Sequence, residues 1–308
     1  MGDSLVSVII NCLNGEKFLR EAIDSVYAQT YNNWEIILWD NASTDKTAEI
    51  GQSYDSKIKY YKSEKVIPLG DARNKALKQC KGEFIAILDC DDIWAPDKLE
   101  KQIPLFKESS IGLVFCDCIF FKAGGKEWRH YSKRRPYIGN CFRQLLTDFS
   151  LVLSTVVIRT SVFKNLDEHF DTRFNVLEDA DLFRRIAFYW EVDFVNEPLA
   201  KWRVHKDSWT WSKTDLFITE NEMLLEKFKS VIPRFEEDYA AEIQQLTKTV
   251  NIKKARQHWS EGDGRLARKE LIKNMPDIKS LALYIISFFP VRVGERLITI
   301  FRGDFSAN

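Results

Sequence analysis

Three carboxylates follow directly after a short apolar run. The run spans Phe84 to Leu88, as is typical of a buried strand, and Asp89, Asp91 and Asp92 come next. Like charges this close together repel one another unless a cation lies among them. Carboxylate oxygens are hard ligands that suit Mg²⁺ or Mn²⁺ better than zinc. The stretch therefore predicts a divalent-cation site; the alternative is that these residues only cap the helix that follows.

Two more polar clusters end strand-like runs in the same way. Residues 11–14 follow the run Val6 to Ile10, and Asp40 follows the run Glu35 to Trp39. In α/β proteins, phosphorylated ligands bind at the carboxyl ends of parallel strands. We therefore expect all three clusters to meet at one edge of a sheet.

Strand and helix patterns alternate through the first part of the chain, which predicts a largely parallel sheet with right-handed crossovers. We expect strands at 6–10, 35–39, 58–61 and 83–88, and helices at 16–29, from the turn at 41–45 to about 54, and at 70–80. Further on we expect a helix after Pro96 to about 107, strands at 112–121, 154–159, 194–195 and 199–204, and a helix at 178–190.

Beyond about Thr214 the pattern changes to long helices with few strand signals. We expect helices at 219–230, 235–258 and 265–273. This change predicts a strand-and-helix domain at 1–213, which contains the polar clusters, and a C-terminal helical region at 214–308.

Bulk composition excludes several classes of protein. The 308 residues carry 45 Lys and Arg against 45 Asp and Glu, so no global field attracts nucleic acid. The six cysteines lack paired CxxC spacing, which predicts a reduced, cytoplasmic protein without disulfides or zinc. The first residues lack the pattern of a signal peptide, and no apolar run is as long as a membrane-spanning helix.

An ordered set of motifs resembles family 2 glycosyltransferases of the GT-A fold. The motifs are Val-Ser-Val-Ile-Ile followed by Asn14-Gly15, then residues 40–45, 70–74 and 89–92, then Glu178-Asp179, and finally 202–205 with Ser208. The resemblance covers about Val6 to Ser212. The family's usual Pro-Thr-Tyr before Asn14 is replaced here by Asn11-Cys12-Leu13. The resemblance implies a Rossmann-like mixed, mainly parallel sheet flanked by helices, with a C-terminal helical extension.

Family members transfer a sugar from a nucleotide sugar, commonly a UDP-sugar, to an acceptor hydroxyl with inversion at the anomeric carbon. The resemblance implies nucleotide contacts at Asn14, Asp40, Arg73 and Asp89. It also implies a Mn²⁺ or Mg²⁺ ligand at Asp91, with His205 as a further metal or diphosphate contact. Asp179 corresponds to the general base. Weaker phosphate or acceptor contacts fall on Asp92, Glu178 and Ser208.

Each of these residues also has a structural interpretation. Glu178 and Asp179 are common residues at a helix start, where the helix dipole would keep Asp179 ionised. His205 is alternatively a packed strand-end residue, and Asp40 a turn residue. Arg73 alternatively pairs with Asp71 or lies on a solvated helix face.

Two basic segments point to the acceptor. The polar loop from Lys122 to Arg135 has six basic residues and one acidic residue, and the apolar stretch from Lys279 to Arg302 has basic flanks. Together they predict a lipid-linked or growing glycan acceptor, in cell-surface polysaccharide assembly, at the inner face of the cytoplasmic membrane. The alternatives are a solvated loop, and a tail that packs on the protein or forms a homo-oligomer.

Two other classes of function remain open. A nucleotidyltransferase that makes nucleotide sugars would need a Gly-rich phosphate loop with a basic residue after the first strand, and residues 11–15 offer one Gly and no Arg. A non-catalytic nucleotide- or glycan-binding protein would not need Asp179.

Overall fold

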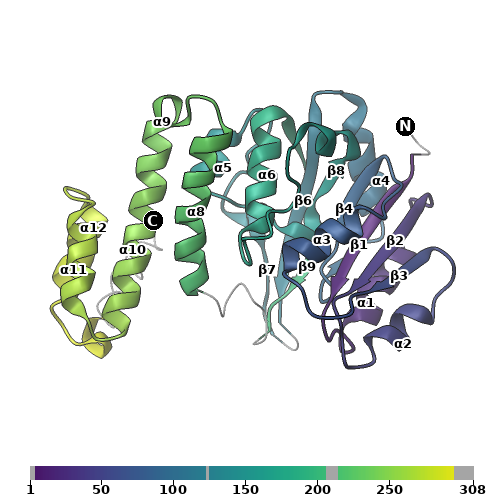
Figure 1. The fold of residues 1–308 in the computed structure, drawn as a ribbon, viewed down its shortest axis with the longest axis horizontal. Helices are drawn as coiled ribbons and strands as arrows, with labels where there is room; N and C mark the ends of the chain where they lie inside the picture. The colour runs from purple at the N-terminus through teal and green to yellow at the C-terminus, as the bar shows by residue number, and fades with distance from the viewer. Residues whose placement is uncertain (1–3, 123–124, 206–213, 295–308) are drawn as a thin grey trace. The chain divides into compact units, whose positions relative to one another are not determined.

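The computed structural model describes residues 4–122, 125–205 and 214–294 (Figure 1). The chain separates into two compact units, residues 1–213 and 214–308. The strands of the first unit are β1 (Val6–Cys12), β2 (Trp34–Asp40), β3 (Ile58–Lys62), β4 (Phe84–Ile87), β5 (Ile93–Trp94), β6 (Ile111–Phe121), β7 (Glu127–Arg129), β8 (Val157–Arg159) and β9 (Glu191–Arg203). Its α-helices are α1 (Leu19–Tyr27), α2 (Thr47–Gln52), α3 (Leu69–Leu77), α4 (Lys98–Gln102), α5 (Phe142–Thr147) and α6 (Glu178–Tyr189).

Within the described residues the strands form one nine-stranded sheet in the order β3-β2-β1-β4-β8-β6-β9-β5, and β7 pairs with β6. Strands β3, β2, β1 and β4 are parallel, β8 is antiparallel to both of its neighbours, and β6 and β9 are parallel. The predicted mixed, mainly parallel sheet flanked by helices is therefore confirmed.

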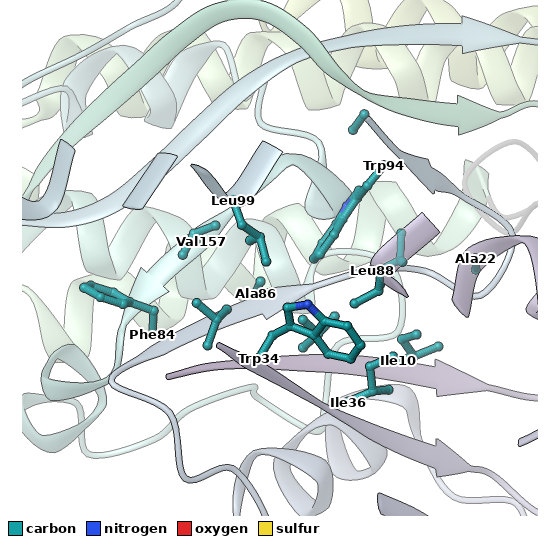
Figure 2. Close-up of a cluster of buried hydrophobic side chains, with 14 of the residues drawn as sticks. Ile10, Ala22, Trp34, Ile36, Phe84, Ala86, Leu88, Trp94, Leu99 and Val157 are labelled. Atoms are coloured by element: carbon teal, nitrogen blue, oxygen red, sulfur yellow. The ribbon is translucent and has the colours of Figure 1, made fainter. Parts of the chain in front are cut away.

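The strand sequences explain why the sheet is central. Every residue of β1 and β2 is buried, as expected for parallel strands that are covered on both faces. Figure 2 shows the core on one face, where Ile10, Ile36 and Ala86 come from three neighbouring strands. Trp34 and Trp94 fill the remaining space beside them.

Several elements of the unit differ from the prediction, and the strand expected at 154–159 is shorter because Leu153–Thr155 form a 3₁₀ turn. The two short strands expected at 194–204 are one strand, β9, whose irregular pairing with β6 at Cys116 and Asp117 breaks the alternation of its side chains. Helix α5 and strand β5 are too short to produce a period in the sequence. The expected loop 122–135 contains β7, which pairs with β6 but is exposed at all three residues, so no apolar signal marks it.

The second unit is helical. It contains α8 (Thr214–Val231), α9 (Phe235–Asp238), α10 (Ala240–Ser260), α11 (Gly264–Ile272) and α12 (Ile278–Ile286). Its small core joins Ile252, Trp259, Leu271 and Ile286 from α10, α11 and α12. In the parts of the chain that the structure describes, no helix combines the length and apolarity needed to cross a membrane.

One buried charge stands out in the first unit. Lys98, at the start of α4, is 0% exposed, and its Nζ lies 4.1 Å from the centre of the Trp94 ring. This Nζ has no hydrogen-bond partner among the described residues. Burial lowers the pKa of Lys98 to about 8, because the charged form is poorly solvated there.

We expect Lys98→Met to raise the free energy of unfolding at pH 7 by about 1–3 kcal/mol, because a buried charge is replaced by an apolar chain of similar size. The unfolded state holds the lysine proton up to its ordinary pKa of 10.5, so the wild type becomes more stable as the pH rises from 8 to 10.5. The gain from methionine should therefore shrink between pH 7 and pH 10. Urea unfolding at both pH values measures this, with the exposed Lys107→Met as control; equal gains at both pH values would contradict it.

Candidate active site

The ends of β1, β2 and β4 lie side by side. Asn11 and Cys12 pair with Trp39 and Asp40, and the N–H of Leu88 donates to the carbonyl of Ile9 at 3.0 Å. The three polar clusters therefore meet at the carboxyl edge of the sheet, as the sequence predicts.

The loops after β1 and β2 are bonded to each other. The N–H of Asn14 donates to Ser43 Oγ at 2.8 Å, and Asn14 Oδ1 accepts from the N–H of Thr44 at 2.9 Å. Asn14 and Ala42 have φ of 55° and 64°, a left-handed conformation that is costly for alanine. Asn14 thus holds two loops together and is itself exposed.

Asp40 supports the turn after β2. Its Oδ1 accepts from the N–H of Ser43 at 2.7 Å, and its Oδ2 accepts from the hydroxyl of Tyr60 at 2.6 Å. Burial and the neighbouring carboxylate raise the pKa of Tyr60 well above its usual range. Asp40 is 0% exposed, so the geometry matches the turn-residue alternative.

Asn11 belongs to the site, although the sequence analysis places it only within a polar cluster. It is buried at the end of β1, and neither its Oδ1 nor its Nδ2 has a hydrogen-bond partner among the described residues. An unpaired buried amide is costly. The signal in the sequence that could have identified Asn11 is a polar amide directly after the apolar run Val6 to Ile10, where a buried strand would continue.

Arg73 on α3 is the centre of the charged cluster. It is 4% exposed and donates to Glu178 Oε1 at the start of α6, and to Asp89 Oδ1 at 3.2 Å. One guanidinium thus links α3, the loop after β4 and α6. Arg73 is therefore not the solvated helix residue of the alternative interpretation.

The carboxylates around Arg73 outnumber it. Desolvation by burial raises the pKa of Glu178 to about 7 and that of Asp89 to about 6, despite the attraction of Arg73. Burial also raises the pKa of Asp179, against the downward shift that the helix dipole alone would give. Burial disfavours the charge of Arg73, but Glu178 and Asp89 more than compensate and raise its pKa. Arg184 is a second cation near Asp179, so three carboxylates face two guanidinium groups in this cluster.

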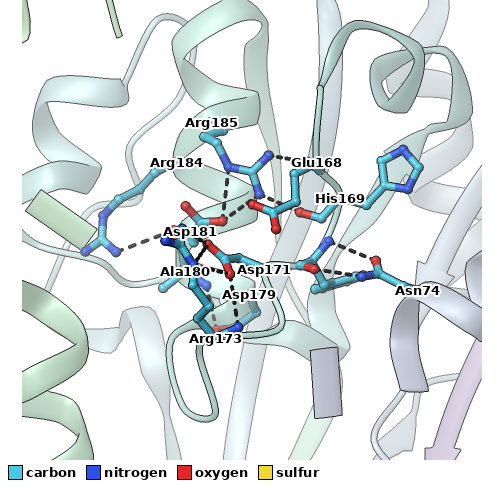
Figure 3. Close-up of polar contacts among 11 residues, drawn as sticks. Asn74, Glu168, His169, Asp171, Arg173, Asp179, Ala180, Asp181, Arg184 and Arg185 are labelled. Carbon is cyan, nitrogen blue, oxygen red and sulfur yellow. Dashed lines mark hydrogen bonds and ion pairs between the residues drawn. The ribbon is translucent and has the colours of Figure 1, made fainter. Parts of the chain in front are cut away.

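Hydrogen bonds between α3, α6 and segment 168–171 hold the elements that carry this cluster (Figure 3). Asn74 follows Arg73 on α3. Its Nδ2 donates to the carbonyl of Phe170 at 2.7 Å, and its Oδ1 accepts from the N–H of Phe170 at 3.0 Å. Asp181 pairs with Arg185 at 2.6 Å, and Arg185 also donates to the carbonyls of residues 168 and 169. Segment 168–171 therefore ties α3 to α6, which sets the position of Asp179.

Asp91 and His205 form the other half of the site. Asp91 Oδ2 lies 2.8 Å from His205 Nε2, and both side chains are about a quarter exposed, at 25% and 22%. No group of three or more His, Cys, Asp and Glu side chains is placed to enclose a metal within the ranges described. The Asp91 carboxylate nevertheless fits Mg²⁺ or Mn²⁺ held partly by ligand phosphates, as is usual for these ions, and His205 adjoins it.

Asp92 differs from its neighbour. It is 1% exposed, its Oδ2 accepts from Ser154 Oγ at 2.5 Å, and its Oδ1 accepts from the N–H of Arg203 at 2.9 Å. Burial raises the pKa of Asp92 well above its ordinary value. Asp92 anchors the loop that carries Asp91 and is closed to solvent. Ser208 lies outside the described residues.

Comparison with known proteins identifies the family. The model of the family described as "Glycosyl transferase family 2" matches residues 7–168. The chain belongs to glycosyl transferase family 2. It is 37% identical over 210 residues to an uncharacterized glycosyltransferase of Rickettsia typhi, which covers 65% of this chain and 64% of the relative.

Two further comparisons give a relative with a named activity and a solved structure of similar fold. It is 41% identical over 116 residues to the Escherichia coli UDP-Glc:alpha-D-GlcNAc-diphosphoundecaprenol beta-1,3-glucosyltransferase WfgD, over 37% of this chain and 46% of WfgD. The chain thus spans about half to two thirds of these relatives. The crystal structure of S. aureus TarS in complex with UDP-GlcNAc has a TM-score of 0.64 at 20% identity, over 92% of this chain and 79% of that one. This likeness confirms the GT-A fold.

Glu178→Gln tests whether the carboxyl of Glu178 beside Arg73 holds its proton more tightly in the folded state. The pKa of Glu178 is about 7 in the folded state against an ordinary 4.5, so the folded protein binds the extra proton and loses stability as the pH rises from 4.5 to 7. Between pH 5 and pH 8 we expect the free energy of unfolding of Glu178→Gln to fall by less than that of the wild type. The difference between the two falls should be on the order of 1–3 kcal/mol. Urea unfolding measures this, and the exposed Glu64→Gln is the control. Parallel pH profiles for Glu178→Gln and wild type would contradict the assignment.

Proposed function

We propose that this chain is an inverting glycosyltransferase that moves a sugar from a UDP-sugar to a hydroxyl of a lipid-linked saccharide or growing polysaccharide. The observation that carries the proposal is the meeting of Arg73, Asp89, Asp91 and Asp179 at one edge of the sheet, in a chain of family 2. The donor and acceptor are supported by the names of two similar proteins, WfgD and TarS, which refer to UDP-sugars and, for WfgD, to a diphosphoundecaprenol-linked acceptor.

In this proposal Asp179 takes the proton of the acceptor hydroxyl. An inverting displacement needs a base on the face opposite the leaving group. Burial raises the pKa of Asp179, which makes it a stronger base than an exposed aspartate. Arg73 orients Asp89 toward the nucleotide and holds Glu178 beside Asp179, while Asn14 and Asp40 shape the loops that receive the base.

Asp91 and His205 would hold Mn²⁺ or Mg²⁺ in this proposal, and Asp92 would keep Asp91 in place through Ser154. When bound, the cation supplies charge that stabilises the departing nucleotide diphosphate. The six free cysteines suit a reducing compartment, so we place the reaction on the cytoplasmic side. A peripheral membrane contact and a homo-oligomer remain parts of the proposal.

A panel of nucleotide sugars, incubated with the full chain and Mn²⁺ or Mg²⁺, tests the proposal. We expect release of UDP from one donor, and NMR of the product should give the inverted anomeric configuration. Formation of pyrophosphate from a nucleoside triphosphate and a sugar phosphate would instead identify a nucleotidyltransferase. Donor binding without turnover, with WfgD-type lipid-linked acceptors present, would identify a non-catalytic binding protein.

Asp179→Asn keeps the size of the side chain and the start of α6 but cannot accept the proton. We expect transfer to fall by about 10²-fold or more, with donor binding nearly unchanged. Single-turnover transfer and calorimetric titration of UDP measure the two effects. Asp215→Asn, an exposed aspartate near the start of another helix, is the matched control. Surviving transfer would move the base to Glu178 or Asp181.

Removal of the metal tests Asp91. We expect a chelator to abolish transfer and added Mn²⁺ or Mg²⁺ to restore it. Asp91→Ala should lose activity by about 10²-fold or more at every metal concentration while remaining folded by circular dichroism. Asp97→Ala, a nearby partly exposed aspartate that pairs with Lys101, is the control. Full activity in excess chelator would exclude a required metal.

A further inference from the structure

Helix α12 carries apolar residues on its exposed side as well as on its buried side. Ile278, Leu281 and Ile285 are 84%, 47% and 55% exposed. The buried side carries Ile286, at 7%, which packs in the small core of the unit, together with Ser280, at 0%, and Ser287, at 6%. A helix that served only its own core would be polar on its exposed side.

The exposed apolar side continues beyond the helix. Phe288, Phe289 and Val293 are 63%, 45% and 45% exposed. We call the six residues Ile278, Leu281, Ile285, Phe288, Phe289 and Val293 the outer apolar face. Single exposed apolar residues are ordinary, but three at helical spacing on α12 with three more directly after it are typical of a contact surface.

Charge indicates what this surface contacts. Residues 264–294 contain six Lys and Arg against two Asp and Glu, whereas residues 214–263 contain seven against ten. Lys279 and Arg292 are exposed beside the ends of the outer apolar face, and the Arg268 guanidinium lies 4.1 Å from the centre of the Phe288 ring. Pairing two copies through this face would bring like charges together, whereas an anionic surface would attract them.

We propose that the outer apolar face inserts into the interface of a bilayer rich in anionic lipid. Helix α12 has nine residues, about 14 Å in length, whereas a spanning helix needs about 20 residues. It therefore lies along the interface, with its apolar side chains among the acyl chains and Lys279, Arg268 and Arg292 at the head groups. This inference rests on the membrane contact of the proposed function but uses neither the donor nor the reaction, so its failure would leave the proposed sugar transfer untouched.

Co-sedimentation of the full chain with vesicles tests the inference. We expect binding to vesicles of equal parts phosphatidylglycerol and phosphatidylcholine, and binding weaker by about tenfold or more to phosphatidylcholine alone or at high salt. Leu281→Glu with Ile285→Glu should lower binding to the anionic vesicles by about tenfold or more. Both side chains are exposed, so the double variant should keep the circular dichroism and UDP affinity of the wild type.

Ile138→Glu is the matched control, because this isoleucine of the first unit is 58% exposed, close to the 55% of Ile285. We expect its binding to anionic vesicles to equal that of the wild type. Equal sedimentation of the Leu281→Glu/Ile285→Glu variant and the wild type would overturn the inference, as would sedimentation of neither. A wild-type dimer in light scattering that the double variant converts to a monomer, without vesicle binding, would instead assign the face to a second copy.

Discussion

The structure of the site depends on one buried guanidinium. Arg73 joins the helix after β3, the end of β4 and the start of α6 through Glu178 and Asp89. These carboxylates lie 105 and 16 residues from it along the chain, so the ion pairs hold together parts that the sheet alone does not connect. Breaking a buried pair is far more costly than never forming one, because it leaves charges uncompensated in a poorly solvated place.

That guanidinium does not neutralise its surroundings. Glu178, Asp89 and Asp179 surround Arg73, with Arg184 as a second cation near Asp179, and burial raises the pKa of all three carboxylates. Such a cluster favours whatever brings positive charge to the exposed side of Asp89 and Asp91, and it keeps Asp179 basic. Stability and proton acceptance are therefore opposed here, which is common where carboxylates carry chemistry.

The sequence predicts the parallel half of the sheet well because its strands are short β-branched runs with polar ends. It predicts β7 and α5 poorly because neither produces a period in the sequence. Within the site, Asp91 and Asp92 are adjacent in sequence, yet Asp91 meets His205 and Asp92 is enclosed by Ser154 and the backbone of Arg203. That difference depends on contacts between residues far apart in the chain, which no local pattern records.

The carboxyl edge of the sheet departs from the rules that the core obeys. Every residue of β1 and β2 is buried. Where these strands end, however, Asn11 is buried without a hydrogen-bond partner among the described residues, and Ala42 adopts a left-handed backbone. Arg73 and Glu178 are buried in the same region, with Nε and Oε2 unpaired among the described residues. Each departure lowers stability, and selection for stability alone would remove it. Four such departures gather at this edge, while the buried Lys98 is a further one at the start of α4, and their number at the edge supports the candidate site without reference to family membership.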